Sequence, residues 1–133
     1  MTLLYIKQLS GDDNRCGGSL IADQWVVSAA HCFKDTYKGL VSTRKIRLIL
    51  GEHDTSKDGE TKIPRKEIKI EKIVYHKEFN KLKMNENDVA LLKLSTKVNL
   101  NIYTPICLPN PSDDFTDKKA WVTGKTVGLI LIN

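Results

Sequence analysis

Six short, β-prone segments, each bounded by turn-forming residues, limit what this chain can fold into more than any other feature. The segments are residues 2–9, 16–21, 25–27, 45–50, 67–74 and 89–94. Only residues 28–33 have the pattern of a helical turn. Many short strands with turns between them are typical of β-barrels and β-sandwiches. We therefore expect an all-β fold, and a chain of 133 residues has room for one such domain.

The pattern of apolar residues differs between three of these segments. In residues 45–50, apolar and polar side chains alternate, as in a strand with one buried face. In residues 67–74 the alternation is interrupted at Glu71 and Lys72, where we expect a β-bulge. Residues 89–94 are almost continuously apolar, which predicts a strand buried on both faces.

Charge is distributed unevenly along the chain. The net charge is +5, and residues 62–83, with eight lysines and arginines against three glutamates, carry a net charge of the same size. A basic patch of this kind can bind nucleic acid or heparin, although a solvated surface is the commoner explanation. We expect no nucleic-acid partner and leave heparin binding to experiment. No apolar run approaches the ~20 residues of a membrane-spanning helix, so we expect no membrane segment.

The chain has three cysteines: Cys16, Cys32 and Cys107. Because the number is odd, at least one is free or pairs with another chain. Cys16, His31 and Cys32 are residue types that bind zinc, but an adjacent histidine and cysteine are poorly spaced for one tetrahedral site, and no fourth ligand is evident. The first residues have neither a basic region nor a small-residue cleavage site, so we expect no signal peptide in this chain.

Five short motifs carry the strongest functional signal. Cys-Gly-Gly-Ser-Leu-Ile begins at Cys16, and Trp-Val-Val-Ser-Ala-Ala-His-Cys ends at Cys32. Further along are Asn-Asp-Val-Ala-Leu-Leu-Lys-Leu at 87–94, Ile-Cys-Leu-Pro at 106–109 and Trp-Val-Thr-Gly at 121–124. In wording and order, the chain resembles the chymotrypsin/trypsin-like serine proteases over residues 2–124.

The resemblance implies a fold and a division of the chain. Residues 1–118 would form a six-stranded antiparallel Greek-key barrel, which is the N-terminal half of the family's two-barrel fold. Residues 119–133 would hold the first strand of the second barrel, followed by a tail that has no counterpart in the family.

The resemblance also implies roles for individual residues. His31 would act as general base and then general acid, while the Asp88 carboxylate would hold the other ring nitrogen so that the correct tautomer faces a serine hydroxyl. Histidine precedes aspartate along the chain, as in this family. A disulfide between Cys16 and Cys32 would tie the histidine turn to the preceding strand.

The third member of the catalytic triad is missing from the sequence. The family carries its nucleophile in Gly-Asp-Ser-Gly-Gly, and none of the seven serines here has that context: Ser10, Ser19, Ser28, Ser42, Ser56, Ser95 and Ser112. The oxyanion-hole donors beside that serine and the pocket that selects the substrate are missing with it. We therefore expect a truncated serine endopeptidase that is inactive as this chain. The alternative is a non-catalytic serine-protease homologue that binds other proteins.

Cys107 suggests a partner. In related proteases with a regulatory light chain, the cysteine of this linker bonds to the pro-segment, so Cys107 is expected to be unpaired here or bonded to another chain. Together with the wording Gly-Glu-His-Asp at 51–54, this favours the clip-domain type. The resemblance further implies protein substrates or inhibitors as partners and an extracellular parent protein, because disulfides form in oxidising compartments.

A calcium site is a weaker hypothesis. In many members of the family the loop that follows Gly51 binds calcium through two glutamates and backbone carbonyls. Glu52, Asp54, Asp58 and Glu60 are the candidate ligands, and Glu52 matches the first glutamate. Calcium prefers six to eight oxygen ligands, and the later positions align poorly. We expect a solvated acidic loop and no cofactor.

Overall fold

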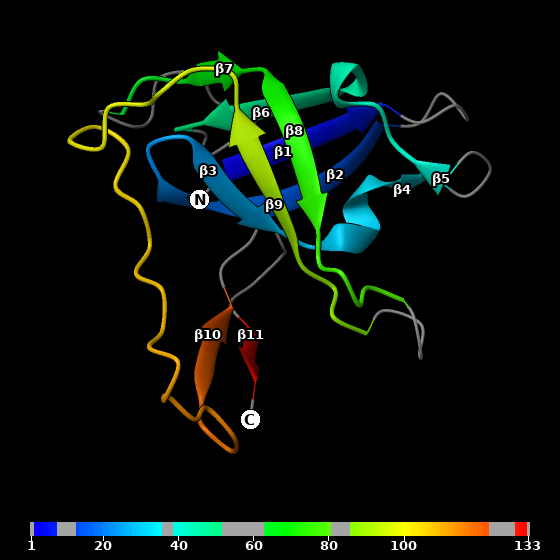
Figure 1. Cartoon of the computed structure of the whole chain (residues 1–133). Coiled ribbons are helices and arrows are strands. Elements are labelled where there is room, and N and C mark those ends of the chain that lie inside the picture. Colours follow the sequence, from blue (N-terminus) through cyan, green and yellow to red (C-terminus); the bar gives the residue numbers. More distant parts are fainter. Residues whose placement is uncertain are drawn as a thin grey trace.

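The computed structural model describes residues 2–7, 13–35, 39–51, 63–80, 86–122 and 130–132. The main sheet contains β1 (Thr2–Lys7), β2 (Asp13–Ala22), β3 (Trp25–Ser28), β6 (Ile46–Leu50), β7 (Lys66–Ile68), β8 (Ile70–Tyr75) and β9 (Ala90–Leu94). Two small sheets pair β4 (Lys34–Asp35) with β5 (Gly39–Leu40), and β10 (Ala120–Val122) with β11 (Ile130–Ile132). The helical elements among these residues are short 3₁₀ turns, η1 (Ala30–Phe33) and η2 (Thr43–Lys45), which confirms the all-β expectation (Figure 1).

The order of strands in the main sheet is β7-β6-β1-β2-β3-β9-β8, and every pairing is antiparallel. In chain order, β6, β1, β2 and β3 are the fourth, first, second and third strands, which is the Greek-key arrangement. The two edge strands, β7 and β8, follow each other along the chain with only Lys69 between them. The sheet therefore curls until one continuous stretch of chain borders both of its edges.

The strand count differs from the expected six because this closing stretch changes partner. Its first part, β7, pairs with β6, and its second part, β8, pairs with β9. Lys69 lies at the change, and its carbonyl accepts a hydrogen bond from the Ser95 amide at 2.9 Å. One strand expected from the sequence is thus two strands in the structure.

The bulge expected in this stretch is present. Ile70 lies opposite Leu94 and Lys72 lies opposite Lys93, so Glu71 has no partner of its own in the register. The extra residue brings two lysines opposite each other, and the Glu71 carboxylate accepts a hydrogen bond from the Lys93 ammonium at 2.9 Å. The acidic side chain at the bulge thereby offsets the repulsion between the two cations.

The barrel interior is filled by apolar side chains from all of the main strands. In β6, Ile46, Leu48 and Leu50 are buried and Arg47 is exposed, as the alternating pattern predicts. Ile49 is also fully buried, so the outer face of this strand is partly covered. Phe33, at the end of η1, is among the largest side chains with no exposed surface.

The expectation that residues 89–94 form a strand buried on both faces is wrong. Ala90, Leu92 and Leu94 are buried, but Leu91 and Lys93 are half-buried, and Val89 precedes the strand and is exposed. A barrel that curls round one core buries only the inner face of each strand. The apolar outer residue Leu91 therefore contributes less burial than the sequence pattern indicated.

The structure explains why the second residue after Cys16 in the Cys-Gly-Gly motif is a glycine. Gly18 lies in β2 between Thr2 of β1 and Ser28 of β3. A Cβ atom at this position would come within 2.8 Å of the Thr2 hydroxyl and 2.9 Å of a Val26 methyl group. A larger residue would push the three strands apart. Gly17, by contrast, faces open space.

Beyond β9, the chain leaves the barrel as a long linker without regular structure, residues 95–119. Figure 1 shows it passing down one side of the molecule toward β10 and β11. These two strands pair with each other and not with the main sheet.

Candidate active site

His31 is presented to solvent by a turn whose other residues are buried. Ala29 is extended, and η1 then turns the chain so that Ala30, Cys32 and Phe33 pack into the core. The His31 side chain remains 54% exposed. Small alanines before the histidine let the backbone turn close against the barrel, which explains the wording Ala-Ala-His-Cys in structural terms.

Asp88 reaches His31 through the register of the sheet, although 57 residues separate the two. Ser28, at the end of β3, lies opposite Ala90, at the start of β9. The residues just after β3 and just before β9 are therefore neighbours at one end of the barrel. Asn87 has a φ of +52°, a left-handed conformation that asparagine tolerates better than most residues, and it turns the chain immediately before Asp88.

The Asp88 carboxylate holds His31 at two points. One oxygen, Oδ1, accepts a hydrogen bond from the His31 backbone amide at 2.7 Å. The other, Oδ2, lies 2.6 Å from His31 Nδ1. Because an ionised carboxylate only accepts hydrogen bonds, Nδ1 carries a proton, and in the neutral imidazole Nε2 therefore has the free lone pair. The pair therefore fixes both the orientation and the tautomer of the imidazole.

The environment of Asp88 favours its charged form. Partial burial by itself raises the pKa of the carboxyl group. The hydrogen bond from the His31 side chain, the hydrogen bonds from the His31 and Ala30 amides and the proximity of the His31 ring lower it further than burial raises it, so the pKa of Asp88 lies below its ordinary value of 3.8. The carboxylate remains an acceptor for Nδ1–H at neutral pH.

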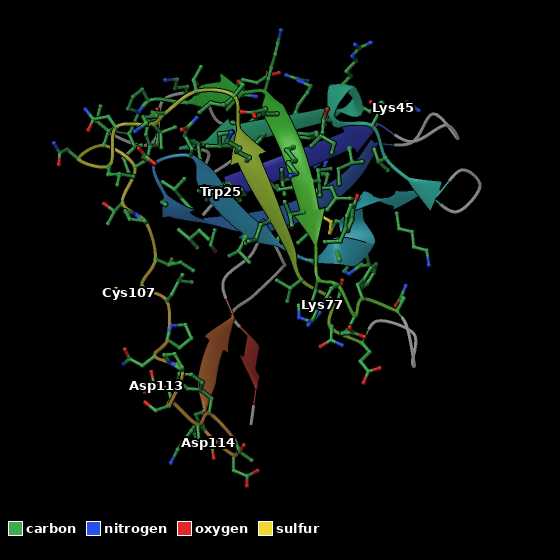
Figure 2. The ribbon with its side chains drawn as sticks, viewed as in Figure 1. Trp25, Lys45, Lys77, Cys107, Asp113 and Asp114 are labelled. Carbon is green, nitrogen blue, oxygen red and sulfur yellow. A yellow bond between two sulfur atoms is a disulfide. The ribbon has the colours of Figure 1, made fainter. Side chains whose placement is uncertain are left out.

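The predicted disulfide is present: Cys16 of β2 is bonded to Cys32 of η1. Figure 2 shows the yellow sulfur–sulfur bond beside η1 and Cys107 apart from it on the linker. Cys107 is exposed and forms no disulfide with Cys16 or Cys32. With both sulfurs of Cys16 and Cys32 bonded to each other, neither is a thiolate that could bind zinc in this state.

The free nitrogen of the histidine faces the disulfide and solvent. His31 Nε2 lies 3.7 Å from Cys32 Sγ. Among the described residues, no serine hydroxyl is hydrogen-bonded to this ring. Ser28, the serine nearest along the chain, donates its hydroxyl hydrogen to the Gly17 carbonyl at 2.8 Å, which is a structural role.

One residue that the sequence did not single out supports the histidine turn. Tyr75, in β8, donates its hydroxyl hydrogen to the Phe33 carbonyl at 3.3 Å, and burial raises the pKa of this phenol above 10.0. It anchors the last residue of η1 to β8, an edge strand of the main sheet. The inward register of a tyrosine with a polar tip is the only signal in the sequence that could have indicated this contact.

The calcium candidates Glu52, Asp54, Asp58 and Glu60 lie outside the described residues. Part of the basic stretch, residues 63–80, is described. Its best-defined contact is an ion pair in which Glu67 accepts hydrogen bonds from Arg47 at 3.0 and 2.7 Å. Arg47 also lies over the Tyr5 ring, with Arg15 on a neighbouring strand at a similar distance.

A Greek-key β-barrel that presents a carboxylate-bound histidine beside a disulfide at one end is the arrangement of the N-terminal barrel of trypsin-like proteins. The trypsin family model matches residues 3–128, and the chain belongs to this family.

Similar proteins agree with the family assignment. The chain is 40% identical to trypsin-4 of Rattus norvegicus over 117 residues and 39% identical to serine protease 1 of the same organism over 108 residues, covering 86% and 80% of the chain. It is 38% identical to the serine protease filzig of Drosophila melanogaster over 113 residues, or 84% of the chain. A solved structure described as "Structure of GrC" superposes on 85% of the chain with a TM-score of 0.65 and 27% identity.

The chain spans only part of each of these proteins. It corresponds to 41% of trypsin-4, 38% of serine protease 1 and 6% of filzig, and to 44% of the solved structure. The family match, over residues 3–128, includes both His31 and Asp88.

Proposed function

We propose that this chain supplies the general base and the orienting carboxylate of a serine endopeptidase. The observation that carries the proposal is the double contact between Asp88 and His31, which selects the neutral tautomer in which Nε2 has the free lone pair and lies away from the carboxylate. Membership of the trypsin family supports it. The same geometry favours an enzyme over a non-catalytic homologue, because a protein that only binds others has no need of an oriented imidazole.

In the proposed reaction, His31 Nε2 accepts the proton of a serine hydroxyl while the serine oxygen attacks the carbonyl carbon of a peptide bond. The imidazolium that forms is stabilised by the ionised Asp88. It then gives the proton to the leaving amine, and an acyl-enzyme remains. Water, deprotonated by the same nitrogen, releases the acid product. Asp88 stays ionised throughout, in keeping with its lowered pKa.

The nucleophile in this proposal comes from residues that the 133-residue sequence does not include. No serine here lies in the Gly-Asp-Ser-Gly-Gly context, and the oxyanion-hole donors and the substrate pocket accompany that motif. In a convergent protease, loss of the nucleophile alone costs about 10⁶ in rate, and the residual ~10³–10⁴ over water comes from the oxyanion hole and substrate binding. With those elements missing as well, the chain by itself should not exceed solution chemistry.

The test has two parts. Residues 1–133, refolded under oxidising conditions, are treated with a fluorophosphonate probe and assayed with a peptide ester; we expect no stoichiometric labelling and no turnover. Labelling of any serine, together with turnover that His31→Ala abolishes, would contradict the proposal that the nucleophile lies outside these 133 residues. Genomic sequence downstream of the codon for Gly124 is then searched for Gly-Asp-Ser-Gly-Gly. A second barrel whose motif lacks the serine would favour the non-catalytic alternative.

Further parts of the proposal concern the whole protein. We place the boundary of the first barrel at residues 118/119, where the chain has left the main sheet and before β10 begins. The substrates and inhibitors would be proteins. The site of action would be extracellular, which the disulfide supports. Cys107, exposed on the linker, would bond to a light chain or pro-segment. Non-reducing electrophoresis of the natural protein, with Cys107→Ser as control, tests this last point.

A further inference from the structure

The disulfide and the histidine form one cluster of three potential metal ligands. Cys16 Sγ, Cys32 Sγ and His31 Nε2 or Nδ1 all lie within 4.8 Å of one another. In the oxidised chain the two sulfurs bind each other. We propose that reduction of the Cys16–Cys32 disulfide creates a zinc site made of these two thiolates and His31 Nε2. The proposal concerns metal binding and does not depend on whether the chain takes part in proteolysis.

The first support is the distance between sulfur and nitrogen. Zinc binds thiolate sulfur at about 2.3 Å and imidazole nitrogen at about 2.0–2.1 Å, so a tetrahedral ion separates such atoms by about 3.6 Å. Cys32 Sγ already lies 3.7 Å from His31 Nε2. Two of the three ligands are therefore in place in the oxidised structure. Only the Cys16 sulfur has to move, from bonded contact with Cys32 to about 3.8 Å, and its side chain is half-buried, not locked in the core.

The second support is the partner of the other ring nitrogen. Metal-binding histidines usually donate their second N–H to a carboxylate, which fixes the tautomer and raises the basicity of the ligating nitrogen. His31 does this, because Nδ1 lies 2.6 Å from Asp88 Oδ2. The arrangement that prepares Nε2 to accept a proton prepares it equally to bind a metal ion.

The third support is access. His31 is exposed while Cys32 is buried, so the three ligands span the surface and the interior. Because the His31 side chain is 54% exposed, water can reach an ion held by these three ligands and supply the fourth ligand. A three-ligand site with two thiolates and one imidazole is a set that zinc accepts.

The chemistry balances with one named reductant. A dithiol gives two electrons and two protons to the disulfide and is itself oxidised to a cyclic disulfide, leaving two thiols on Cys16 and Cys32. Zinc then displaces both thiol protons, which pass to the buffer. Because the site forms only after reduction, metal binding would depend on the redox state of the chain. The bound ion would also occupy Nε2, the atom that accepts the proton in the proposed proteolytic reaction.

The experiment measures zinc directly. Residues 1–133 are reduced with dithiothreitol, freed of it by gel filtration without oxygen, and titrated with zinc against a chromophoric chelator; Co²⁺ replaces zinc for spectroscopy. We expect one zinc per reduced chain, none per oxidised chain, and visible bands of tetrahedral cobalt with sulfur-to-cobalt charge transfer. His31→Asn should weaken binding by at least about tenfold, and Asp88→Asn by about tenfold.

Matched controls separate this site from ordinary thiol binding. His76→Asn removes another exposed histidine, and Cys107→Ser removes the exposed thiol; neither should change the affinity. Zinc should also protect His31, and not His76, from acylation by diethyl pyrocarbonate in the reduced chain only, as read by mass spectrometry. Equal zinc affinity in wild type and His31→Asn would overturn the proposal even if reduction unfolds the chain. So would the absence of binding at micromolar zinc.

Discussion

The barrel interior and the linker of residues 95–119 both contain large apolar side chains, but the burial of these side chains differs between the two regions. The inward-facing leucines and isoleucines of the main strands, such as Leu48 and Leu92, are buried, whereas Leu108 and Phe115 of the linker are 62% and 63% exposed. Residue type alone thus says little about burial. The difference arises because every second side chain of a strand points into the shared barrel interior. The burial of a linker side chain depends instead on which part of the barrel lies next to it.

The linker has two parts, and Ile106 is the last residue of the first part. In the first part, the backbone amides of Val98 and Ile106 donate hydrogen bonds to the carbonyls of Asp23 and Leu20. The Tyr103 hydroxyl donates to the Pro64 carbonyl at 2.8 Å. In the second part, the hydrogen bonds found among the described residues are local, such as the one from the Asn110 amide to the Asp113 carboxylate. The first part is held by the barrel, and the second part presents its apolar side chains to solvent.

The sharpest test of this contrast is a matched pair of leucine truncations. Leu48→Ala, inside the barrel, should lower the free energy of unfolding by about 2–5 kcal/mol, because it leaves a cavity in a packed core. Leu108→Ala should change it by no more than about 0.5 kcal/mol. Urea unfolding followed by tryptophan fluorescence measures both. A similar cost for the two variants would mean that the linker packs against the barrel in solution.

The cysteines allow a second comparison of the two regions. Replacing Cys16 and Cys32 together with serine opens a loop of 16 residues and should lower the free energy of unfolding by about 3 kcal/mol, since the unfolded chain regains conformational freedom. Cys107→Ser, on the linker, should leave stability unchanged. Thermal unfolding monitored by circular dichroism distinguishes them, and an unaltered melting temperature in the double variant would contradict the prediction.

The His31 end of the barrel is intermediate between core and linker, because Asp88 is 23% exposed. Asp88→Asn should lower the free energy of unfolding at neutral pH by about 1 kcal/mol, as hydrogen bonds to a charged group are weakened. The folded state depresses the pKa of Asp88, so this contribution is present above the ordinary value of 3.8 and is lost as the pH falls through the lower, folded value.

The measurement is urea unfolding of wild type and Asp88→Asn at a series of pH values from about 6 to about 2. The free energy of unfolding should fall more steeply with decreasing pH in the wild type than in Asp88→Asn, so the difference in stability between the two proteins should become smaller. A constant difference would mean that the Asp88 carboxylate is not preferentially ionised in the folded protein.

The smallest change in the free energy of unfolding is expected for a substitution on the outer face of the barrel. Glu67→Gln removes the charge that Arg47 binds, and the pair is about half exposed. Exposed ion pairs contribute about 0.2–1 kcal/mol and are screened by salt, so the loss should lie at the low end and vanish in high salt. A double-mutant cycle with Arg47→Met isolates the coupling. A coupling that persists in high salt would show that the two hydrogen bonds, and not unscreened charge alone, join Arg47 to Glu67.

Much of the fold could be predicted from local patterns. The alternation in residues 45–50 marked three of the four buried residues of β6, all but Ile49, and the interruption at Glu71 marked the bulge in β8. The change of partner at Lys69 could not be predicted, because it depends on how far the whole sheet curls before β7 and β8 meet β6 and β9. The same curvature left the outer face of β9 only half-buried, although its apolar residues indicated otherwise.

For the site, the sequence by itself determined the residue types and their order: a histidine after Ala-Ala, an aspartate before an apolar strand, and cysteines that could pair. These depend on motifs only a few residues long. Only the tertiary structure decided that Asp88 holds both the amide and the ring of His31, that Tyr75 supports the turn, and that the disulfide faces Nε2. The contacts of Asp88 and Tyr75 join η1 to residues 42 or more positions further along the chain, so they depend on the register of the sheet, which no single segment of the sequence specifies.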